Sequence, residues 1–320
     1  MHRTIALTGA TGFIGSSLAP RLAAAGWQVR ALVRPSSSRA RLAGLSPQWI
    51  EGDLDDAASL RRLVSGAEVV VHCAGIVRGT CHAQFYRVNA DGVARLAEAA
   101  LEQDPVPRFL LISSLAAREP ALSPYAASKR QGEIALSTAG RAMAWTALRP
   151  PAVYGPGDHG LLPLFRWMER GIAPVLGQDG ARFSLLYVED LADAVLHWLG
   201  AGHTERSTFE LDDGHPNGYA WEDVIEAVSR LRSRRVRRVR VPQPLLALLA
   251  WLNVMAARAI GHAPMLTPGK VRELTHPNWV CDNAAFSRVT DWRPRVSLEE
   301  GLRRTLGGGA PMTEPLLGQR

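Results

Sequence analysis

In the first half of the chain, short apolar runs alternate with stretches in which apolar residues recur at the spacing of a helix. The apolar runs are four to six residues long, and their alternation with the helical stretches is the pattern of strands alternating with helices. The expected strands are residues 4–7, 28–33, 49–52, 69–72, 108–113 and 145–148. The expected helices are residues 13–25, 59–64, 89–101 and 124–138. This order of short apolar strands and helices predicts an α/β fold, with a parallel sheet covered by helices on both faces.

The regular alternation ends near residue 155. Gly and Pro interrupt the stretch that follows, and a helix is then expected at 190–199 with Asp190 as its N-cap. Mixed helices and short strands are expected from there, and the last residues, GGGAPMTEPLLGQR, show no periodicity. The expected divisions are a sheet domain over 1–155 with a return around 182–200, a smaller part over 156–305, and a mobile tail over 306–320.

Composition limits the class of protein. Apolar residues make up 47% and charged residues 21% of the 320 positions, which is typical of a globular chain and excludes a disordered one. Three cysteines are too few for a disulfide framework, so a reducing compartment is expected. No run of about eighteen uncharged apolar residues occurs, and the N-terminus leads directly into the first expected strand. We therefore expect a cytoplasmic protein.

The net charge is +7, and seven arginines stand in residues 230–240, RLRSRRVRRVR. Such a run can contact nucleic acid or an anionic membrane. The alternation of Arg and Val in VRRVRVP instead favours a half-buried strand whose arginines face water. Neither an aromatic platform nor zinc-finger spacing accompanies the run, so no nucleic acid is expected as a partner.

Residues 244–257 form an apolar stretch of helical pattern that is too short, at about fourteen residues, to span a bilayer. Packing in the core is the favoured interpretation. Lining of a lipophilic pocket and peripheral contact with a membrane surface remain alternatives.

A glycine-rich turn follows the first expected strand and opens the first expected helix. It reads Thr8-Gly9-Ala10-Thr11-Gly12-Phe13-Ile14-Gly15. In this position one glycine allows the sharp turn, one lets a pyrophosphate approach the backbone, and one lets helix and sheet pack closely. The N–H groups and positive dipole of the helix N-terminus favour phosphate. The motif predicts a Rossmann-type doubly wound parallel sheet that binds NAD(P), with a smaller C-terminal substrate-binding part.

The end of the second expected strand bears on the choice of cofactor. An acidic residue there usually binds the ribose 2′-hydroxyl of NAD, but this chain reads Arg34-Pro35-Ser36-Ser37-Ser38-Arg39. Guanidinium and hydroxyl groups suit a 2′-phosphate, which a carboxylate would repel. We therefore expect NADP(H) in preference to NAD(H), which remains an alternative.

A tyrosine and a lysine share one face of an expected helix. The chain has only two lysines, and Lys129 follows Tyr125 by four residues, in a stretch whose Ser-Pro start suits a helix N-terminus. An ammonium near a phenol lowers the pKa of the phenol, which would make Tyr125 a usable acid or base near neutral pH. Ser113 and Ser114 end the fifth expected strand, where a hydroxyl can hydrogen-bond a substrate oxygen.

These motifs, in this order, resemble the extended short-chain dehydrogenase/reductase superfamily, with its NAD-dependent epimerases/dehydratases and 3β-hydroxysteroid dehydrogenases. The resemblance spans about residues 1–200, with a weaker echo near the C-terminus. Its motifs are TGATGFIG at 8–15, Gly52-Asp53-Leu54, His72-Cys73-Ala74-Gly75, Asn89 in RVNADG, Ile112-Ser113-Ser114, Tyr125-xxx-Lys129, LRPPAVYGPGD at 148–158 and Tyr187-Val188-Glu189-Asp190-Leu191-Ala192. The echo is Trp292-Arg293-Pro294 and Leu298-Glu299-Glu300-Gly301-Leu302.

The resemblance implies an NAD(P)H-dependent oxidoreductase that transfers a hydride between nicotinamide and a carbonyl or alcohol. It implies Tyr125 as the general acid/base and Lys129 as the modulator of its pKa and the ribose anchor. Ser114 would orient the substrate, and Asn89 would support the site. The expected cofactor-binding residues are Gly9, Thr11, Gly12, Phe13, Ile14, Gly15, Arg34, Asp53, Leu54, Ala74, Gly75, Tyr125, Lys129, Pro150 and Val153. Relatives often pair through a four-helix interface, which here would use 89–101 and 124–138, so a homodimer is one alternative.

Two departures from the pattern concern the substrate. Relatives that act on nucleotide sugars commonly read Ser-Ser/Thr-x-x-Val-Tyr-Gly after the fifth strand, where this chain reads Ser114-Leu115-Ala116-Ala117-Arg118, and they often carry Asn at the position of Ala152. A lipophilic small-molecule substrate is therefore favoured. A sugar-nucleotide epimerase or dehydratase that recycles its cofactor remains an alternative, and a non-catalytic NADPH-binding sensor or assembly subunit is a second one.

The cysteines suggest no further chemistry. His72-Cys73 and Cys81-His82 match the spacing of no common zinc site, so no metal is expected. Cys281 lacks a neighbouring His–Asp pattern and is expected to be inert.

Overall fold

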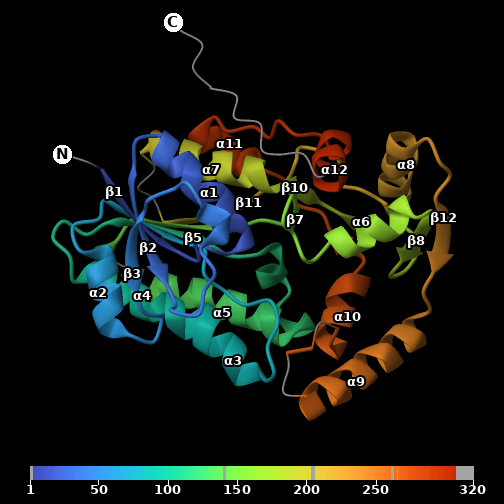
Figure 1. Ribbon diagram of the computed structural model, residues 1–320, viewed down its shortest axis with the longest axis horizontal. Coiled ribbons are helices and arrows are strands. Elements are labelled where there is room, and N and C mark those ends of the chain that lie inside the picture. Colours follow the sequence, from blue (N-terminus) through green and yellow to red (C-terminus); the bar gives the residue numbers. More distant parts are fainter. Residues whose placement is uncertain (1–2, 140–141, 203–205, 261–262, 265, 308–320) are drawn as a thin grey trace, which may run out of the picture.

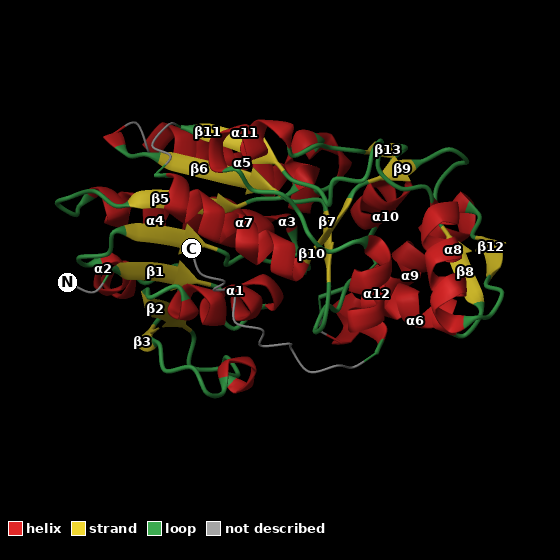
Figure 2. Cartoon of the chain, turned by 90° about the horizontal axis from the view of Figure 1, so that it is seen from above, coloured by secondary structure: helices red, strands yellow, loops and turns green. Residues whose placement is uncertain are grey.

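The structure is a computed structural model that describes residues 3–139, 142–202, 206–260, 263–264 and 266–307. Most of the expected mobile tail, from residue 308 onward, lies outside the described residues. The described chain folds into a large sheet flanked by helices and a smaller group of helices and short strands beside it (Figures 1 and 2).

A seven-stranded sheet forms the larger part. Its strand order is β11-β6-β5-β4-β1-β2-β3, and all neighbouring strands are parallel. Six of these strands follow the order 3-2-1-4-5-6 of a doubly wound dinucleotide-binding sheet, and β11 adds one more beside β6, so the predicted Rossmann-type α/β fold is confirmed. The strands are β1 (Thr4–Thr8), β2 (Gln28–Val33), β3 (Gln48–Glu51), β4 (Val69–His72), β5 (Arg108–Ile112), β6 (Trp145–Arg149) and β11 (Ser207–Glu210).

Helices cover both faces of this sheet (Figure 1). α1, α7 and α11 pack together on one face, and α2, α4 and α5 pack together on the other. The helices of this part are α1 (Phe13–Ala24), α2 (Ala57–Val64), α3 (His82–Tyr86), α4 (Gly92–Leu101), α5 (Pro124–Ala139), α7 (Val188–Ala201) and α11 (Ala284–Thr290). The expected helix at 89–101 begins instead as a π-helical turn, η2 (Arg87–Asp91), which leads into α4.

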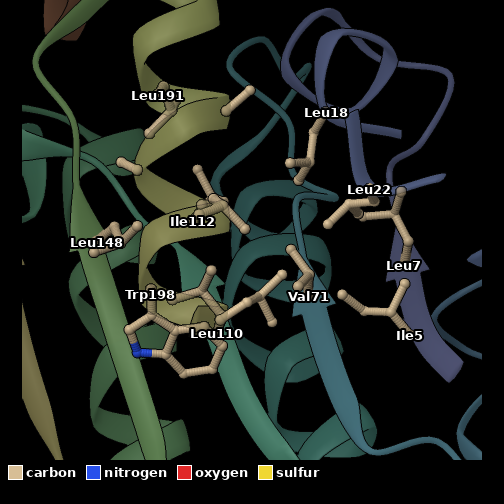
Figure 3. Packing of buried hydrophobic residues seen from close by; sticks show 14 of the residues in the cluster. Ile5, Leu7, Leu18, Leu22, Val71, Leu110, Ile112, Leu148, Leu191 and Trp198 are labelled. Carbon is tan, nitrogen blue, oxygen red and sulfur yellow. The ribbon is translucent and has the colours of Figure 1, made fainter. Parts of the chain in front are cut away.

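The core between the sheet and α1 and α7 consists largely of apolar side chains (Figure 3). Side chains of the strands meet those of the two helices, and those labelled in the figure are at most 3% exposed. They are Ile5, Leu7, Leu18, Leu22, Val71, Leu110, Ile112, Leu148, Leu191 and Trp198. Burial of each such side chain stabilises the fold by about 1.5–3 kcal/mol, which fixes the strand ends where the loops of the site begin.

The smaller part consists of short parallel strand pairs and helices. The pairs are β7 (Ala152–Tyr154) with β10 (Leu185–Tyr187), β8 (Ile172–Val175) with β12 (Arg237–Arg240), and β9 (Arg182–Phe183) with β13 (Asn278–Trp279). The helices are α6 (Leu162–Glu169), α8 (Trp221–Arg232), α9 (Gln243–Ile260), α10 (Pro268–Thr275) and α12 (Leu298–Leu306). Short 3-10 turns elsewhere are η1 (Ala40–Leu42), η3 (Leu115–Arg118) and η4 (Pro120–Leu122).

Asp190 is not the N-cap of the helix that contains it, contrary to the sequence prediction. Because β10 runs directly into α7, the helix begins at Val188 and Asp190 lies in its first turn. The buried carboxylate accepts hydrogen bonds from the backbone N–H groups of Arg295 and Val296, at 3.1 and 3.0 Å. These two hydrogen bonds anchor the segment that follows Trp292-Arg293-Pro294 to α7.

Two predictions about the stretch from 230 to 257 are corrected. The Arg/Val alternation does form a strand, β12, but all four of its residues are exposed because β12 pairs only with β8 at an edge. The apolar helix, α9, is not core: Leu248 and Trp251 are 52% and 56% exposed. Within the described residues, no helix is long and apolar enough to cross a membrane.

Candidate active site

The glycine-rich turn connects β1 to α1 at the carboxyl edge of the sheet. Gly9 has a φ of +71°, and a Cβ there would stand 2.6 Å from the amide nitrogen of Ala74. A Cβ on Gly15 would collide with the carbonyl oxygen of Gly9. α1 begins after Gly12, and in the described structure no side chain caps it and no acidic residue stands in its first turn. The first-turn N–H groups, with Thr11, Phe13 and Ile14 around them, therefore fit an anion such as a pyrophosphate.

The two arginines after β2 have different surroundings. Arg34 is exposed and makes no ion pair with any described residue. Arg39 donates to Glu51 at 2.8 Å and lies over the ring of Trp49, 4.9 Å from its centroid. Glu51 thus neutralises Arg39, and Arg34 is the arginine that remains available to a phosphate.

Asp53 and Leu54 follow β3 and line the same edge. The Asp53 carboxylate accepts hydrogen bonds from the amides of Asp55 and Asp56, at 2.8 and 3.1 Å, so it shapes the turn before α2. Leu54 lies over Gly92, where a Cβ would approach its Cδ1 atom to 2.8 Å. Their placement against an adenine ring stays a prediction.

Asn89 holds the loop after β4 in place. Its side chain accepts a hydrogen bond from the N–H of Ile76 at 2.9 Å, and donates to the carbonyl of Ile76 and to the Ser128 hydroxyl. The π-helical turn that carries Asn89 packs so closely on α5 that a Cβ on Gly132 would meet its carbonyl oxygen. Such turns are frequent at functional sites, and this one positions the loop of Ala74 and Gly75.

Lys129 is buried at the end of β5. Its ammonium donates a hydrogen bond to the carbonyl oxygen of Ile112 at 3.0 Å, and a Cβ on Gly75 would lie 3.2 Å from its Nζ atom. Burial lowers the pKa of Lys129 to about 8. The ammonium therefore stands between the sheet and the loop where a cofactor ribose would lie.

The adjacent serines Ser113 and Ser114 serve different partners. Ser113 donates to the buried Glu133 carboxylate at 2.6 Å, and Arg149 binds the same carboxylate through two hydrogen bonds. Ser114 accepts from the N–H of Ala116 at 3.2 Å and is hydrogen-bonded to Tyr125. Ser114 is therefore the serine that faces the tyrosine, and Ser113 belongs to an ion-pair network.

Tyr125 lies in the first turn of α5, which starts at Pro124 as the sequence predicted. Ser123 caps this helix by accepting a hydrogen bond from the N–H of Ala126 at 3.0 Å. Burial raises the pKa of Tyr125 to about 12, and the hydrogen bond with Ser114 only partly offsets this rise. The predicted lowering of this pKa by Lys129 is therefore wrong for this structure, because the ammonium is bonded to the backbone and burial dominates.

Pro150 and Val153 follow β6. Pro150 is buried and its carbonyl accepts a hydrogen bond from the N–H of Leu115 at 2.8 Å. Val153 is half-buried in β7 and packs against the core beneath the glycine-rich turn. The next residue of β7, Tyr154, contacts α12 of the smaller part. A Cβ on Gly301 of α12 would collide with the Tyr154 hydroxyl, so the two elements pack closely.

Two residues of α10 that the sequence did not indicate lie near Tyr125. Lys270 stands 6.0 Å from the centroid of the Tyr125 ring and 2.8 Å from the Glu273 carboxylate. Glu273 is buried and also accepts a hydrogen bond from Ser123. The sequence carries no local signal for this arrangement, because 150 residues separate Ser123 from Glu273.

His72 is a structural residue. Its Nδ1 atom is hydrogen-bonded to Thr8 at 2.8 Å, and burial lowers its pKa to about 3, so it is neutral. In the part of the chain that the structure describes, no group of three or more His, Cys, Asp or Glu residues could hold a metal ion.

Comparison with known proteins connects this site to a family. Residues 5–210 match the model of the NAD dependent epimerase/dehydratase family. The chain is 39% identical over 285 residues to a ceramide reductase of Caulobacter vibrioides, covering 88% of this chain and 87% of the relative. It is 27% identical over 293 residues to 3beta-hydroxysteroid-dehydrogenase/decarboxylase isoform 1 of Arabidopsis thaliana, covering 81% of this chain and 66% of that protein.

A solved structure supports the fold. MoeE5 in complex with UDP-glucuronic acid and NAD superposes with a TM-score of 0.73 at 21% identity, over 95% of this chain and 98% of the other. Together the family match and the reductase relatives show an enzyme of the NAD(P)-dependent oxidoreductase type, within the short-chain dehydrogenase/reductase superfamily. The family resemblance predicted from the sequence is confirmed.

Proposed function

This chain belongs to the NAD dependent epimerase/dehydratase family, and we propose that it is an NADP(H)-dependent reductase of a ketone-bearing ceramide or a closely similar lipid. The observation that carries the proposal is the 39% identity to a ceramide reductase over 88% of the chain. When the hydride acceptor is a ketone carbonyl carbon, the product of the reduction is the secondary alcohol.

The residues around Tyr125 supply the proton. NADPH, when bound, supplies the hydride. A phenol whose pKa is raised to about 12 is protonated at neutral pH, so Tyr125 would donate its proton to the carbonyl oxygen as that oxygen gains negative charge. Ser114 would hydrogen-bond the same oxygen and stabilise the charge that develops on it. The balance is one ketone, one NADPH and one proton consumed, and one alcohol and one NADP⁺ formed.

The residues at the carboxyl edge fit the rest of the cofactor. The uncapped N-terminus of α1 would receive the pyrophosphate and Lys129 the ribose hydroxyls. The preference for NADP(H) rests on Arg34, which is exposed and has no ion pair with a described residue, whereas Glu51 is occupied by Arg39. A 2′-phosphate at the end of β2 would thus meet a free guanidinium.

Two further proposals concern the division of the chain into domains and its assembly. We propose that residues 1–155 bind the cofactor and that most of 156–305 binds the substrate, although α7, β11 and α11 return to the sheet. We also propose a homodimer through α4 and α5, where Ile134 exposes 41% of its surface.

The first test is the oxidation of NADPH by the purified full chain, with a short-chain ceramide that carries a ketone as substrate. We expect equal amounts of NADPH consumed and alcohol formed, slower turnover with NADH, and turnover about 10²–10⁴-fold slower in Tyr125→Phe. A tightly held cofactor with no net consumption would instead favour a sugar-nucleotide epimerase or dehydratase. Binding of NADPH without turnover of any ketone or nucleotide sugar would favour a non-catalytic sensor or assembly subunit.

A further inference from the structure

α9 presents a stripe of large apolar side chains to solvent. Of the fourteen large hydrophobic residues that are exposed in the described chain, six lie on this one helix. They are Leu245, Leu248, Leu249, Trp251, Leu252 and Met255, each between 44% and 56% exposed. We call these six residues the α9 stripe. A contiguous exposed apolar surface of this kind marks an interaction site.

The opposite face of α9 is fixed to the protein. Leu246 and Ala250 are buried and form a small cluster with Val271 of α10, while Leu176, Val241 and Leu266 pack around it. Figure 1 shows α9 along the lower edge of the molecule, with α10 as its neighbour. Because Leu246 and Ala250 already pack against the protein, rotating α9 to bury the α9 stripe would expose those two residues instead.

The charge of the surrounding sequence is exceptional. Residues 227–272, which we call the basic segment, contain nine arginines, one lysine and no acidic residue, so their formal charge is +10. The whole chain carries +7, which leaves −3 for all other residues. The entire positive excess of the protein therefore lies in the segment that contains α9.

Part of this charge is unpaired. Arg230, Arg232, Arg238 and Arg240 form ion pairs with acidic residues from outside the basic segment. In contrast, Arg234, Arg235 and Arg237 are exposed and, among the described residues, have no acidic partner. Three unpaired guanidinium groups thus precede the apolar helix.

The α9 stripe is also connected to the candidate active site. α10, which packs on α9, carries Lys270 beside the Tyr125 ring and Glu273 hydrogen-bonded to Ser123. A Cβ on Gly269 would stand 2.9 Å from the Ser123 side chain, so α10 fits closely against the start of α5. A partner bound to the α9 stripe would therefore be separated from Tyr125 by one helix, α10.

We propose that the α9 stripe inserts into the surface of a lipid bilayer that contains anionic lipids, with the basic segment against the headgroups. An apolar helical face combined with a cluster of basic residues is the combination that binds such interfaces. A second copy of this chain is a poor occupant, because a two-fold contact would place two segments of +10 against each other. The proposal goes beyond the proposed reductase activity, and it explains how an enzyme without a spanning helix in its described part could reach a lipid substrate.

The test is co-sedimentation of the full chain with vesicles. We expect binding to phosphatidylcholine vesicles in which about a third of the lipid is phosphatidylglycerol, and weak binding to phosphatidylcholine alone. Raising the salt from about 0.1 M to about 1 M shortens the screening length from about 10 Å to about 3 Å and should weaken binding severalfold.

Matched variants assign the binding to the α9 stripe. Trp251→Gln should lower the vesicle affinity by about tenfold, while Trp167→Gln, which alters a tryptophan on α6 that is 49% exposed, should leave it unchanged. Arg234→Gln combined with Arg235→Gln should remove the preference for anionic vesicles.

Two results would overturn the proposal. One is equal vesicle binding by wild type and Trp251→Gln. The other is a dimer in vesicle-free buffer that Trp251→Gln converts to monomer, which would assign the stripe to a second copy. Co-sedimentation requires neither NADPH nor a ketone. Loss of vesicle binding would therefore reject the membrane proposal, while loss of NADPH oxidation alone would reject the reductase proposal.

Discussion

The carboxyl edge of the central sheet and the basic segment at 227–272 use apolar residues in opposite ways. In the sheet, Leu110 and Val71 are completely buried between two helix layers. Ser114 follows β5, and Tyr125 lies in the first turn of α5. In the basic segment, α9 buries Leu246 and Ala250 but exposes six large apolar residues. An apolar run therefore indicates burial only where its neighbours supply a surface to cover it.

The two regions contribute differently to the stability and the function of the protein. Buried strands fix the strand ends to which the candidate catalytic residues are attached, so substitutions there affect folding and chemistry together. The α9 stripe contributes little to folding, because its atoms stay in contact with water in the folded chain. Its apolar character therefore points to a partner outside the chain.

The largest effect is expected at the site. Tyr125→Phe removes the proton donor and should lower kcat by about 10²–10⁴-fold while NADPH binding is unchanged. The matched control is Tyr154→Phe, because the buried Tyr154 hydroxyl has no hydrogen-bond partner among the described residues. Steady-state kinetics and NADPH titration check both variants. Equal losses in the two variants would remove Tyr125 from the mechanism.

A pair of leucine substitutions tests the comparison directly. Leu110→Ala leaves a cavity in the sheet core and should lower the free energy of unfolding by about 2–5 kcal/mol. Leu248→Ala changes a side chain that is 52% exposed and should lower it by less than about 0.5 kcal/mol. Urea unfolding of the two variants measures both values. A large loss for Leu248→Ala would mean that α9 is structural.

The pH dependence sharpens the account of Lys129. Its pKa is lowered to about 8, so the ammonium is charged below this pH and becomes neutral as the pH rises through it. Because the charged ammonium would anchor the cofactor ribose, kcat/KM should fall about tenfold per pH unit above about pH 8. Tyr125, with a pKa of about 12, stays protonated over this range. A profile that is flat to about pH 10 would contradict the assignment.

The smallest of these effects concerns the choice of cofactor. Arg34→Ala should weaken NADPH binding by about tenfold and leave NADH binding unchanged, because only NADPH carries the 2′-phosphate. Arg39→Ala is the control, since Glu51 already neutralises that guanidinium. Titration of each variant with both cofactors decides the matter. An equal loss of both cofactors in Arg34→Ala would reject the 2′-phosphate assignment.

Local patterns predicted most of the sheet and of the site around Tyr125. The Gly9–Gly15 turn and the Tyr125–Lys129 pair are defined by short spacings along the chain, so the sequence alone identifies them. Lys270 and Glu273 could not be placed, because about 150 residues separate them from Tyr125 and only tertiary packing brings α10 to α5. The sequence predicts a lowered pKa for Tyr125, whereas burial in the folded protein raises it. Burial depends on the whole fold, so the local sequence does not reveal it.

The transfer of a deuterium label tests the central claim most directly. Full-length protein would receive NADPH with deuterium at the reactive C4 position and a ketone-bearing ceramide, and the lipid product would be examined by mass spectrometry. The account predicts one deuterium in each alcohol formed, in equal amount to the NADP⁺ released, and labelled alcohol formed about 10²–10⁴-fold more slowly with Tyr125→Phe. Lipid that remains unlabelled while NADPH stays bound and unconsumed would contradict it.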